Sequence, residues 1–460
     1  MLLREAWAAL GGEPELLELV TVSGEEPGLL PSRLAALPAM LAAVATSTLA
    51  ASVLDATRRG ESPAPAAIDA EHVAVAARSE RFARENGVGG ADPFAPLSRF
   101  WRTADGWLRL HANYAWHRER ALRVLGCEDA PAAVEHAVRG WRGEELESAL
   151  AAADALGFVV RGPEEWRAHP QGSAVARLPL LESVAGAGPG RASASASAGA
   201  CAGRGAAGRR VLDLTRVIAG PVATRTLAAW GAEVLRLDSP RLPEIPAQVL
   251  DTLPGKRSAL LDFAEPPGRA RLEELLAEAD VLVQGYRPGA LARFGLAPER
   301  LAERHPHLSV VTLSAWGATG PWADRRGFDS LVQCPTGIAT TEGDDGTPGA
   351  LSAQVLDHAS GYLAAAAALL ALAGVERGEA PRSVRLSLAQ TARWLTSAGT
   401  GEREPARQPR PERFLVSLPG AAGPVQVIGP PGSAGELQPR WASTTRFGAD
   451  PPAFTTSSGT

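Results

Sequence analysis

The sequence predicts an α/β protein built around a parallel sheet, and the main reason lies in residues 210–238. An apolar run of strand length at 211–214 is followed by a helical pattern over 221–230 and by a second apolar run at 234–238. Pro221 at the first helical position and Gly231 after the last one mark the ends of the helix. A strand, a helix and a strand in this order join parallel strands, so the stretch predicts a βαβ unit.

The turn before this helix also indicates a ligand site, although by itself only weakly. Small residues and the free N–H groups of a helix N-terminus suit a phosphate or a nucleotide. Gly220 is the one glycine in the turn, so the stretch is not the GxGxxG fingerprint of dinucleotide-binding proteins. The pattern therefore favours a nucleotide-type fold without naming its ligand.

The chain divides into four segments by composition. Residues 1–184 are mostly helical in pattern, with a strand at 107–111 after the turn at 103–106. Residues 185–208 are rich in Gly, Ala and Ser and predict a flexible linker, because they offer almost nothing apolar to bury. Residues 209–396 form the α/β segment. Residues 397–460 are a tail with a returning strand at 423–428 and a loosely packed end.

Charge and cysteine content exclude several classes of protein. A net charge of −5 gives no reason to expect nucleic acid or acidic lipid as a partner. Three cysteines form neither a disulfide framework nor a metal motif, so we expect no metal and a cytoplasmic location. The Ala-rich runs at 34–54 and 359–373 predict buried helices and not membrane spans, since the first contains Ser and Thr and the second is short of the roughly 20 residues a span needs.

The stretch 210–238 resembles the opening of the family III CoA-transferases, the CaiB/BaiF type that includes formyl-CoA transferase and the acyl-CoA racemases. The resemblance continues through further motifs in family order: Gly255-Lys256-Arg257-Ser258, Tyr286-Arg287-Pro288-Gly289, Gly320-Pro321-Trp322-Ala323-Asp324, Gly327-Phe328-Asp329 and Gln354-Val355-Leu356-Asp357. It implies an open, Rossmann-like parallel sheet with helices on both faces. Residues 100–116 and 163–172 are similar to the family's smaller α+β domain.

The resemblance implies that Asp357 is the nucleophile of CoA transfer. In the family, this carboxylate attacks an acyl-CoA thioester to form a mixed anhydride, and the released CoA thiolate then gives an aspartyl-CoA thioester. A carboxylate is ordinarily ionised at neutral pH, so we expect no general base for the attack. A purely structural interpretation is a helix N-cap before the Ala-rich run, and the two roles are compatible.

The CoA site also follows from the resemblance, residue by residue. The first turn implies nucleotide contacts at Val217, Ile218 and Ala219, and the family's basic positions fall on Lys256, Arg293 and Arg326. A family member with formyl-CoA activity has Gln where Ile218 stands. At the position of a common phosphate contact this chain has Ser239, beside Arg241, and Gly285 replaces the family's Asn. Clustered Arg and Lys suit the phosphates of CoA, although each could also be a solvated surface charge.

An internal repeat relates the two halves of the chain. Residues 27–30 align with 348–351, and in the same register Ala36 aligns with Asp357. After a three-residue gap, residues 60–63 align with 378–381. We therefore interpret the chain as two fused partial copies of one subunit, of which the N-terminal copy is inert. The family forms interlocked dimers, so either a homodimer or a single-chain pseudo-dimer is expected.

Three functions remain open at this stage. CoA transfer between an acyl-CoA and a carboxylic acid is favoured, with acyl-CoA racemisation and non-catalytic CoA binding as alternatives. The family's racemases use a His in a "GHD" motif, where this chain has Phe328, which cannot carry a proton. Asp329 is either a second acidic group of the site or a turn residue. His358 follows Asp357 on one helix and should point elsewhere, and His305 and His307 are expected at the surface.

Overall fold

The computed structural model describes residues 1–24, 27–89, 94–186, 188–191 and 204–455. The α-helices are α1 (Leu2–Ala9), α2 (Ala36–Arg59), α3 (Ala70–Ala76), α4 (Ala115–Leu125), α5 (Pro131–Arg139), α6 (Gly143–Ala152), α7 (Pro163–Ala168), α8 (Pro170–Ala176), α9 (Ala219–Ala229), α10 (Pro246–Thr252), α11 (Pro266–Glu278), α12 (Pro298–Arg304), α13 (Asp329–Val332), α14 (Ile338–Thr341), α15 (Val355–Glu376) and α16 (Leu388–Ser397). The 3₁₀ turns are η1 (Pro14–Leu19), η2 (Ser79–Arg81), η3 (Ala292–Phe294) and η4 (Pro411–Arg413).

The strands are β1 (Val20–Ser23), β2 (Ala66–Asp69), β3 (Arg84–Glu85), β4 (Val88–Gly89), β5 (Phe100–Arg102), β6 (Trp107–Leu110), β7 (Gly157–Val159), β8 (Glu182–Ala185), β9 (Arg210–Leu214), β10 (Glu233–Asp238), β11 (Lys256–Leu260), β12 (Val281–Gln284), β13 (Ser309–Ser314), β14 (Arg382–Ser387), β15 (Leu415–Gly420), β16 (Gly423–Ile428) and β17 (Ser433–Ala434).

The main sheet confirms the predicted parallel α/β fold. Its seven strands run in the order β11-β10-β9-β12-β13-β14-β8, and every neighbouring pair is parallel except β14 with β8. The first six strands have the order of a Rossmann sheet. In this order, strands are added first on one side of β9 and then on its other side. This reversal of strand order lies between β9 and β12, where loops at the carboxyl ends of the strands leave room for a ligand.

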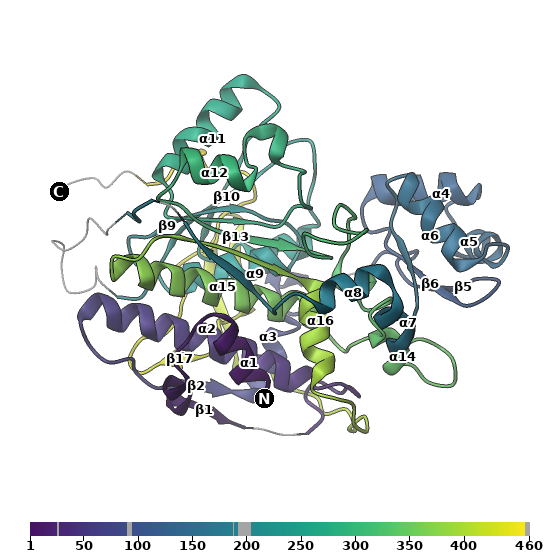
Figure 1. The fold of residues 1–460 in the computed structure, drawn as a ribbon, viewed down its shortest axis with the longest axis horizontal. Coiled ribbons are helices and arrows are strands. Elements are labelled where there is room, and N and C mark those ends of the chain that lie inside the picture. Colours follow the sequence, from purple (N-terminus) through teal and green to yellow (C-terminus); the bar gives the residue numbers. More distant parts are fainter. Residues whose placement is uncertain (25–26, 90–93, 187, 192–203, 456–460) are drawn as a thin grey trace.

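Helices cover both faces of this sheet (Figure 1). On one face, leucines of β9, β10 and β12 pack with leucines of α11 and α12. On the other face, the alternate valines of the same strands pack against α9 and α15. This alternation of side chains along each strand is what buries both faces. Beyond α15 lies α2, and beyond α2 lies the small sheet β1-β2-β17.

The two Ala-rich helices form the centre of the molecule. Both α2 and α15 are long and apolar enough to cross a membrane, but 89% and 94% of their most apolar windows are buried within the protein. They pack against each other along much of their length. Alanines such as Ala43 and Ala365 lie at this buried layer and allow the two backbones to approach closely. The prediction of buried helices is therefore confirmed.

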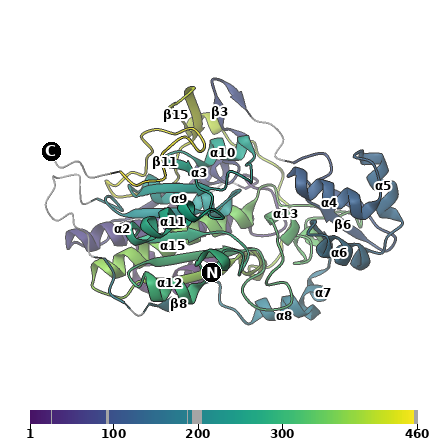
Figure 2. The same ribbon diagram turned by 90° about the horizontal axis from the view of Figure 1, so that it is seen from above.

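A smaller α+β lobe lies to one side of the main body (Figures 1 and 2). It consists of the antiparallel sheet β5-β6-β7 covered by α4, α5 and α6, and it has a hydrophobic core of its own. The strand predicted at 107–111 is β6. The smaller domain implied by the resemblance is thus present, and it comes from the N-terminal half of the chain.

The C-terminal tail differs from its prediction. Residues 423–428 do form a strand, but β16 pairs with β15 and β3 in a separate four-stranded sheet and does not return to the main one. The described residues after it, up to 455, are not loose. Trp441 and Phe454 are buried, and the Asp450 carboxylate accepts the backbone N–H of Ser258 in β11 at 2.8 Å. Tertiary contacts with the main sheet, which no local pattern reveals, order this segment.

Most of the predicted flexible linker lies outside the described residues, at 187 and 192–203. Its two ends are part of the fold. Ala185 ends β8, and the backbone N–H of Gly205 donates to the carboxylate of Asp55 at 2.7 Å. The boundaries placed at 185 and 208 therefore fall within ordered contacts.

Candidate active site

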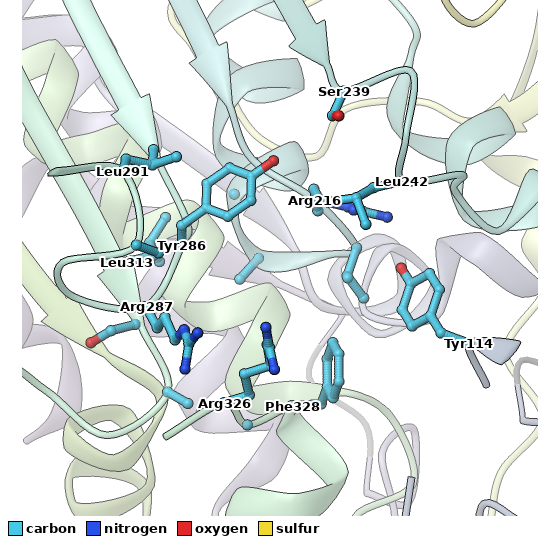
Figure 3. A pocket seen from close by; sticks show the side chains of 18 of the residues that line it. Tyr114, Arg216, Ser239, Leu242, Tyr286, Arg287, Leu291, Leu313, Arg326 and Phe328 are labelled. Atoms are coloured by element: carbon cyan, nitrogen blue, oxygen red, sulfur yellow. The ribbon is translucent and has the colours of Figure 1, made fainter. Parts of the chain in front are cut away.

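A cavity of about 610 Å³ opens at the carboxyl ends of the parallel strands, at the reversal of strand order. Loops after β9, β10, β11, β12 and β13 line one side of it, and the α+β lobe lines the other. Figure 3 shows Tyr286 and Arg287 on the loop after β12, with Tyr114 and Phe328 across the cavity. The place agrees with the rule that open α/β sheets bind ligands at such a crevice.

The turn after β9 brings three predicted contacts to this cavity: Val217, Ile218 and Ala219. Val217 has a φ of 70°, which is strained for a β-branched residue and marks a turn fixed by its surroundings. Ile218 is the N-cap of α9 and makes no side-chain cap hydrogen bond, so the first N–H groups of the helix face the cavity without a side-chain acceptor. The turn can therefore receive a phosphate or an oxyanion.

Gly220 lets this turn lie close to the strand that precedes it. A Cβ at this position would lie 2.3 to 2.7 Å from three side-chain atoms of Thr215. The same threonine donates its hydroxyl to Asp213, and the Oδ1 of Asp213 accepts the N–H of Thr215 at 3.0 Å. A side chain on residue 220 would force the turn open.

Asp357 lies in the first turn of α15 and also lines the cavity. The start of α15 packs against the start of α9, so the candidate nucleophile and the predicted CoA turn line the same cavity. Burial, with the nearby charges of Asp329 and Glu80, raises the pKa of Asp357 well above its ordinary value. The folded protein therefore disfavours the ionised form of this carboxylate, unlike the ordinary carboxylate assumed from the sequence.

Asp357 is not the N-cap of its helix. The N-cap is Gln354, which makes no side-chain cap hydrogen bond. The capping carboxylate comes from another element, because Asp329 at the start of α13 accepts the N–H of Asp357 at 3.0 Å. Burial raises the pKa of Asp329 to about 6, while hydrogen bonds from Asp357 and Gln333 oppose that rise. Asp329 is thus the acidic neighbour of Asp357 and not a surface turn residue.

Lys256 is a correction to the predicted CoA site. Its ammonium is fully buried beneath α9, where it donates to Asp213 Oδ2 and to the carbonyl of Pro221, each at 3.0 Å. Burial lowers the pKa of Lys256 to about 8, against the attraction of Asp213. The residue supports the α9 turn from behind and does not reach the cavity.

The other two predicted cations line the cavity. The guanidinium of Arg293 lies 4.7 Å from the ring centroid of Phe294. The guanidinium of Arg326 is paired with Asp154 of the α+β lobe. Figure 3 shows the side chains of Arg326 and Arg287 next to each other, in the lower part of the picture. Further cavity arginines that the prediction did not commit to are Arg216, Arg241, Arg287 and Arg325.

Most of these arginines have carboxylate partners. Arg216 pairs with the buried Glu244, and Arg241 pairs with Asp262 at 2.8 Å. Ser239, at a family phosphate position, also lines the cavity beside Arg241. These carboxylates offset part of the positive charge at this rim of the cavity, and they hold several of the arginine side chains in place.

Aromatic side chains from the α+β lobe are the part of the site that the sequence prediction missed. Tyr114, Trp116 and His117 line the cavity, and Tyr114 stacks on Trp116 with centroids 4.7 Å apart. Phe328 stacks on His111 at 4.0 Å. The clustering of aromatic residues at 113–117 was the available signal, but only the tertiary structure shows which loop it faces.

The remaining histidines behave differently from one another. His358 is fully buried, points away from the cavity and lies 3.3 Å from Glu80, as its place on the helix predicted. His305 was expected at the surface but is buried and pairs with Glu273 at 3.0 Å. Burial and nearby cations lower the pKa of His111 to about 3 and of His117 to about 4. Within the described ranges, no group of His, Cys, Asp and Glu could hold a metal ion.

Comparisons with known proteins identify a family for the central part of the chain. Residues 207–422 match the family model described as CoA-transferase family III. The chain is 32% identical over 223 residues to the Mycobacterium tuberculosis protein "Probable fatty acyl-CoA transferase Rv3272", which covers 45% of this chain and 56% of that protein. It is 34% identical over 167 residues to the "Formyl-CoA:oxalate CoA-transferase" of Bradyrhizobium diazoefficiens, covering 34% of this chain and 39% of that protein.

The chain thus spans about half the length of the curated relatives it matches. Among solved structures it is similar to a CaiB/BaiF family protein from Brucella suis, with 25% identity and a TM-score of 0.37. That match covers 47% of this chain and 64% of the other.

Proposed function

Residues 207–422 of this chain belong to CoA-transferase family III, and from this premise we propose that the protein moves CoA from an acyl-CoA to a free carboxylic acid. One observation carries the proposal: Asp357 and the α9 turn line the same cavity, which lies where Rossmann-like sheets bind their ligands. The chemistry assigned to Asp357 and the contacts assigned to the turn need that proximity.

Asp357 is the nucleophile in the proposed reaction. Its carboxylate oxygen bonds to the thioester carbon, the carbon–sulfur bond breaks, and CoA leaves as a thiolate. The thiolate then attacks the Asp357 carbonyl of the mixed anhydride, which releases the acyl group as a carboxylate and leaves an aspartyl-CoA thioester. The acceptor acid runs the same two steps in reverse. Two easier steps thus replace one difficult exchange.

The binding of CoA is assigned to Val217, Ile218 and Ala219 with the arginines of the rim. The N–H groups of the α9 N-terminus suit either a phosphate or the oxyanion of the tetrahedral intermediates. Arg293 and Arg326 suit phosphate oxygens, with Arg287 and Arg241 as further candidates. Lys256 acts indirectly by holding Asp213 and the turn.

Racemisation is less well supported by the same cavity. A base that removes the proton next to the thioester needs a pKa near neutrality. Phe328 occupies the position of the racemase histidine, and its neighbour His111 is buried with a pKa lowered to about 3. We expect no exchange of that proton above the buffer background when a 2-methylacyl-CoA is tested in deuterium oxide.

Covalent labelling tests the proposal. The wild-type chain, incubated with a panel of acyl-CoAs and then with hydroxylamine, should carry a hydroxamate on the peptide containing Asp357. Asp357→Asn should carry none. Asp345→Asn is a matched control, because Asp345 is an exposed aspartate in a turn that Asn also tolerates. Binding of CoA without any labelling, by the folded wild type, would favour the non-catalytic alternative.

We also propose that the protein works in the cytoplasm with soluble acyl-CoA and acid substrates. Cys127 and Cys334 are free thiols in the structure, and a reducing compartment keeps cysteines in this form. The predicted homodimer stays a prediction. Its alternative, a single-chain pseudo-dimer, gains support because β8 from the N-terminal half completes the main sheet while β17 from the C-terminal half completes the sheet of β1 and β2.

A further inference from the structure

Asp329 lies directly behind the candidate nucleophile and is fully engaged as a hydrogen-bond acceptor. One carboxylate oxygen accepts the N–H of Asp357 at 3.0 Å, and the other accepts from the side-chain amide of Gln333. The amide oxygen of Gln333 in turn accepts the N–H of Leu351 at 3.0 Å. These hydrogen bonds connect α13 to residues 351–357, which lead into the first turn of α15.

The two carboxyl groups differ in the number of hydrogen-bond donors that they receive. Donors directed at Asp329 favour its ionised form, because an ionised carboxylate only accepts. Within the described residues, the side-chain carboxyl of Asp357 has no protein donor and opens to the cavity. Two buried carboxyl groups this close do not both ionise readily, so a single proton should reside on Asp357 and the charge on Asp329.

On the basis of the proposed transfer reaction, we propose that Asp329 is a positioning residue that orients the first turn of α15 and keeps Asp357 in its neutral acid form while the site is empty. Before Asp357 attacks the thioester, its carboxyl group releases its proton to solvent through the open cavity. The new oxygen–carbon bond then forms, the carbon–sulfur bond breaks, and the negative charge of the Asp357 carboxylate leaves on the CoA thiolate. The pair thus begins with one proton and one negative charge, and it ends with its charge still on Asp329 and its proton in the solvent.

Other charged groups face this pair from neighbouring elements. Glu80 on η2 adds negative charge near Asp357 and is itself paired with His358 on α15. Arg109 on β6 and His358 act on Asp329 in the opposite sense. Burial and the charges of Asp329 and Glu80 raise the pKa of Asp357 well above its ordinary value, in agreement with the unequal hydrogen bonding.

The test is the pH dependence of Asp357 acylation in Asp329→Asn. The Asn side chain still accepts the N–H of Asp357, but it carries no charge. Acylation at acidic pH should rise relative to neutral pH, and the acid limb of the profile should move to lower pH by at least about one unit. Glu80→Gln should move the limb in the same direction by less, because Glu80 is the smaller of the two influences.

Asp251→Asn is a matched control for burial. Asp251 is a buried aspartate paired with Arg225 behind α9, and it does not line the cavity. Its variant should lose stability but keep the acid limb in place. A uniform loss of rate in Asp329→Asn, with an unmoved limb, would show that Asp329 is only structural and would overturn the proposal.

Infrared titration gives a readout that does not need activity. The difference between wild type and Asp357→Asn should contain the C=O stretch of a protonated carboxyl at neutral pH, and the difference measured in the Asp329→Asn background should lose it. If no acyl-CoA labels the wild type at any pH, the transfer reaction fails as a proposal, whereas this titration still tests the proton of the pair. Absence of the protonated band in wild type would overturn the inference.

Discussion

Two regions of this protein are built alike, and only one of them carries a candidate active site. In the C-terminal half, β13 runs parallel to β14, and α15 connects them. In the N-terminal half, β1 runs parallel to β2, and α2 connects them. Each pair is completed by an antiparallel strand from the other half of the chain, β8 in the first case and β17 in the second.

The likeness extends to local geometry. The N-cap residues Ala35 and Gln354 have φ, ψ angles of −75°, 53° and −78°, 64°. Past the far ends of the helices, Gly60 and Gly378 have φ angles of 66° and 85°. The second strand of each unit ends in a residue that caps the next helix, which is Asp69 in one unit and Ser387 in the other. The repeat found in the sequence is therefore a structural repeat.

The geometry corrects one detail of the sequence alignment. Matching the N-caps places Pro38 opposite Asp357, two residues away from the predicted match at Ala36. The positions of the cavities support this match. Pro38 lines a groove at the start of α2, and Asp357 lines the cavity at the start of α15. Proline has no nucleophilic group, so the prediction of an inert N-terminal copy keeps its basis.

The comparison shows that the Ala-rich helix has a packing role in both units, whereas only α15 also carries a candidate catalytic residue. Both units need a helix buried on all sides, and Ala permits it in both. The unit with the candidate site has in addition the strands β9 to β12 with their loops, which the N-terminal copy lacks within the described residues.

Removing the nucleophile should erase the chemical difference between the two units. Asp357→Ala removes the attacking group, and Asp357→Asn keeps the shape without the charge. The loss of covalent catalysis should lower turnover on the order of 10³-fold or more, while CoA binding largely survives. Turnover by a folded Asp357→Ala protein, measured alongside calorimetric binding of CoA, would place the nucleophile elsewhere.

Removing the buried lysine should weaken the nucleotide half, which the N-terminal copy lacks. Lys256→Met leaves Asp213 as an uncompensated charge beneath α9, at a cost of about 3–5 kcal/mol. Urea unfolding measures the loss. In the double variant with Asp213→Asn most of the stability should return, since the stranded charge is gone. A loss confined to CoA affinity would instead mean that Lys256 reaches the ligand.

Asp357→Asn should stabilise the protein while it inactivates it. The raised pKa of Asp357 means that the folded protein retains a proton that the unfolded chain releases above about pH 4. Stability of the wild type therefore falls as pH rises from there toward the folded pKa, and Asn avoids that loss. We expect a gain in the free energy of unfolding at neutral pH, and this gain should disappear below about pH 4. Equal stability curves across this range would contradict the raised pKa.

Placing an acid in the N-terminal copy should have the smallest effect. Pro38→Asp puts a carboxylate in the first turn of α2, where an acid is tolerated by the helix dipole. No acyl label should appear on its peptide, because the groove beside it has no equivalent of the α9 turn. The label is best sought by mass spectrometry of Pro38→Asp in the Asp357→Asn background, where residue 357 cannot be labelled. An acyl label on residue 38 would show that an acid in the first turn of such a helix can be acylated without the α9 turn.

The candidate site was predictable where local sequence determines position. Val217, Ile218 and Ala219 follow a strand and precede a helix, so the sequence places them at the edge of a sheet. Asp357 starts an apolar helix, and its place in the site followed from the family motif. The prediction for Lys256 was wrong because a lysine in a strand can point to either face, and only the packing of α9 over Asp213 decides which.

The sequence by itself determined the parallel sheet, the two buried helices, the smaller lobe and their repeat, because each rests on periodicity, turn residues or motifs within a short stretch. Only the tertiary structure decided that Asp329 caps the helix of Asp357, that Tyr114 and Trp116 face the cavity, and that the tail carrying Trp441 is ordered. These contacts join residues far apart in the chain, and the burial that sets the pKa of Asp357 exists only once they have formed.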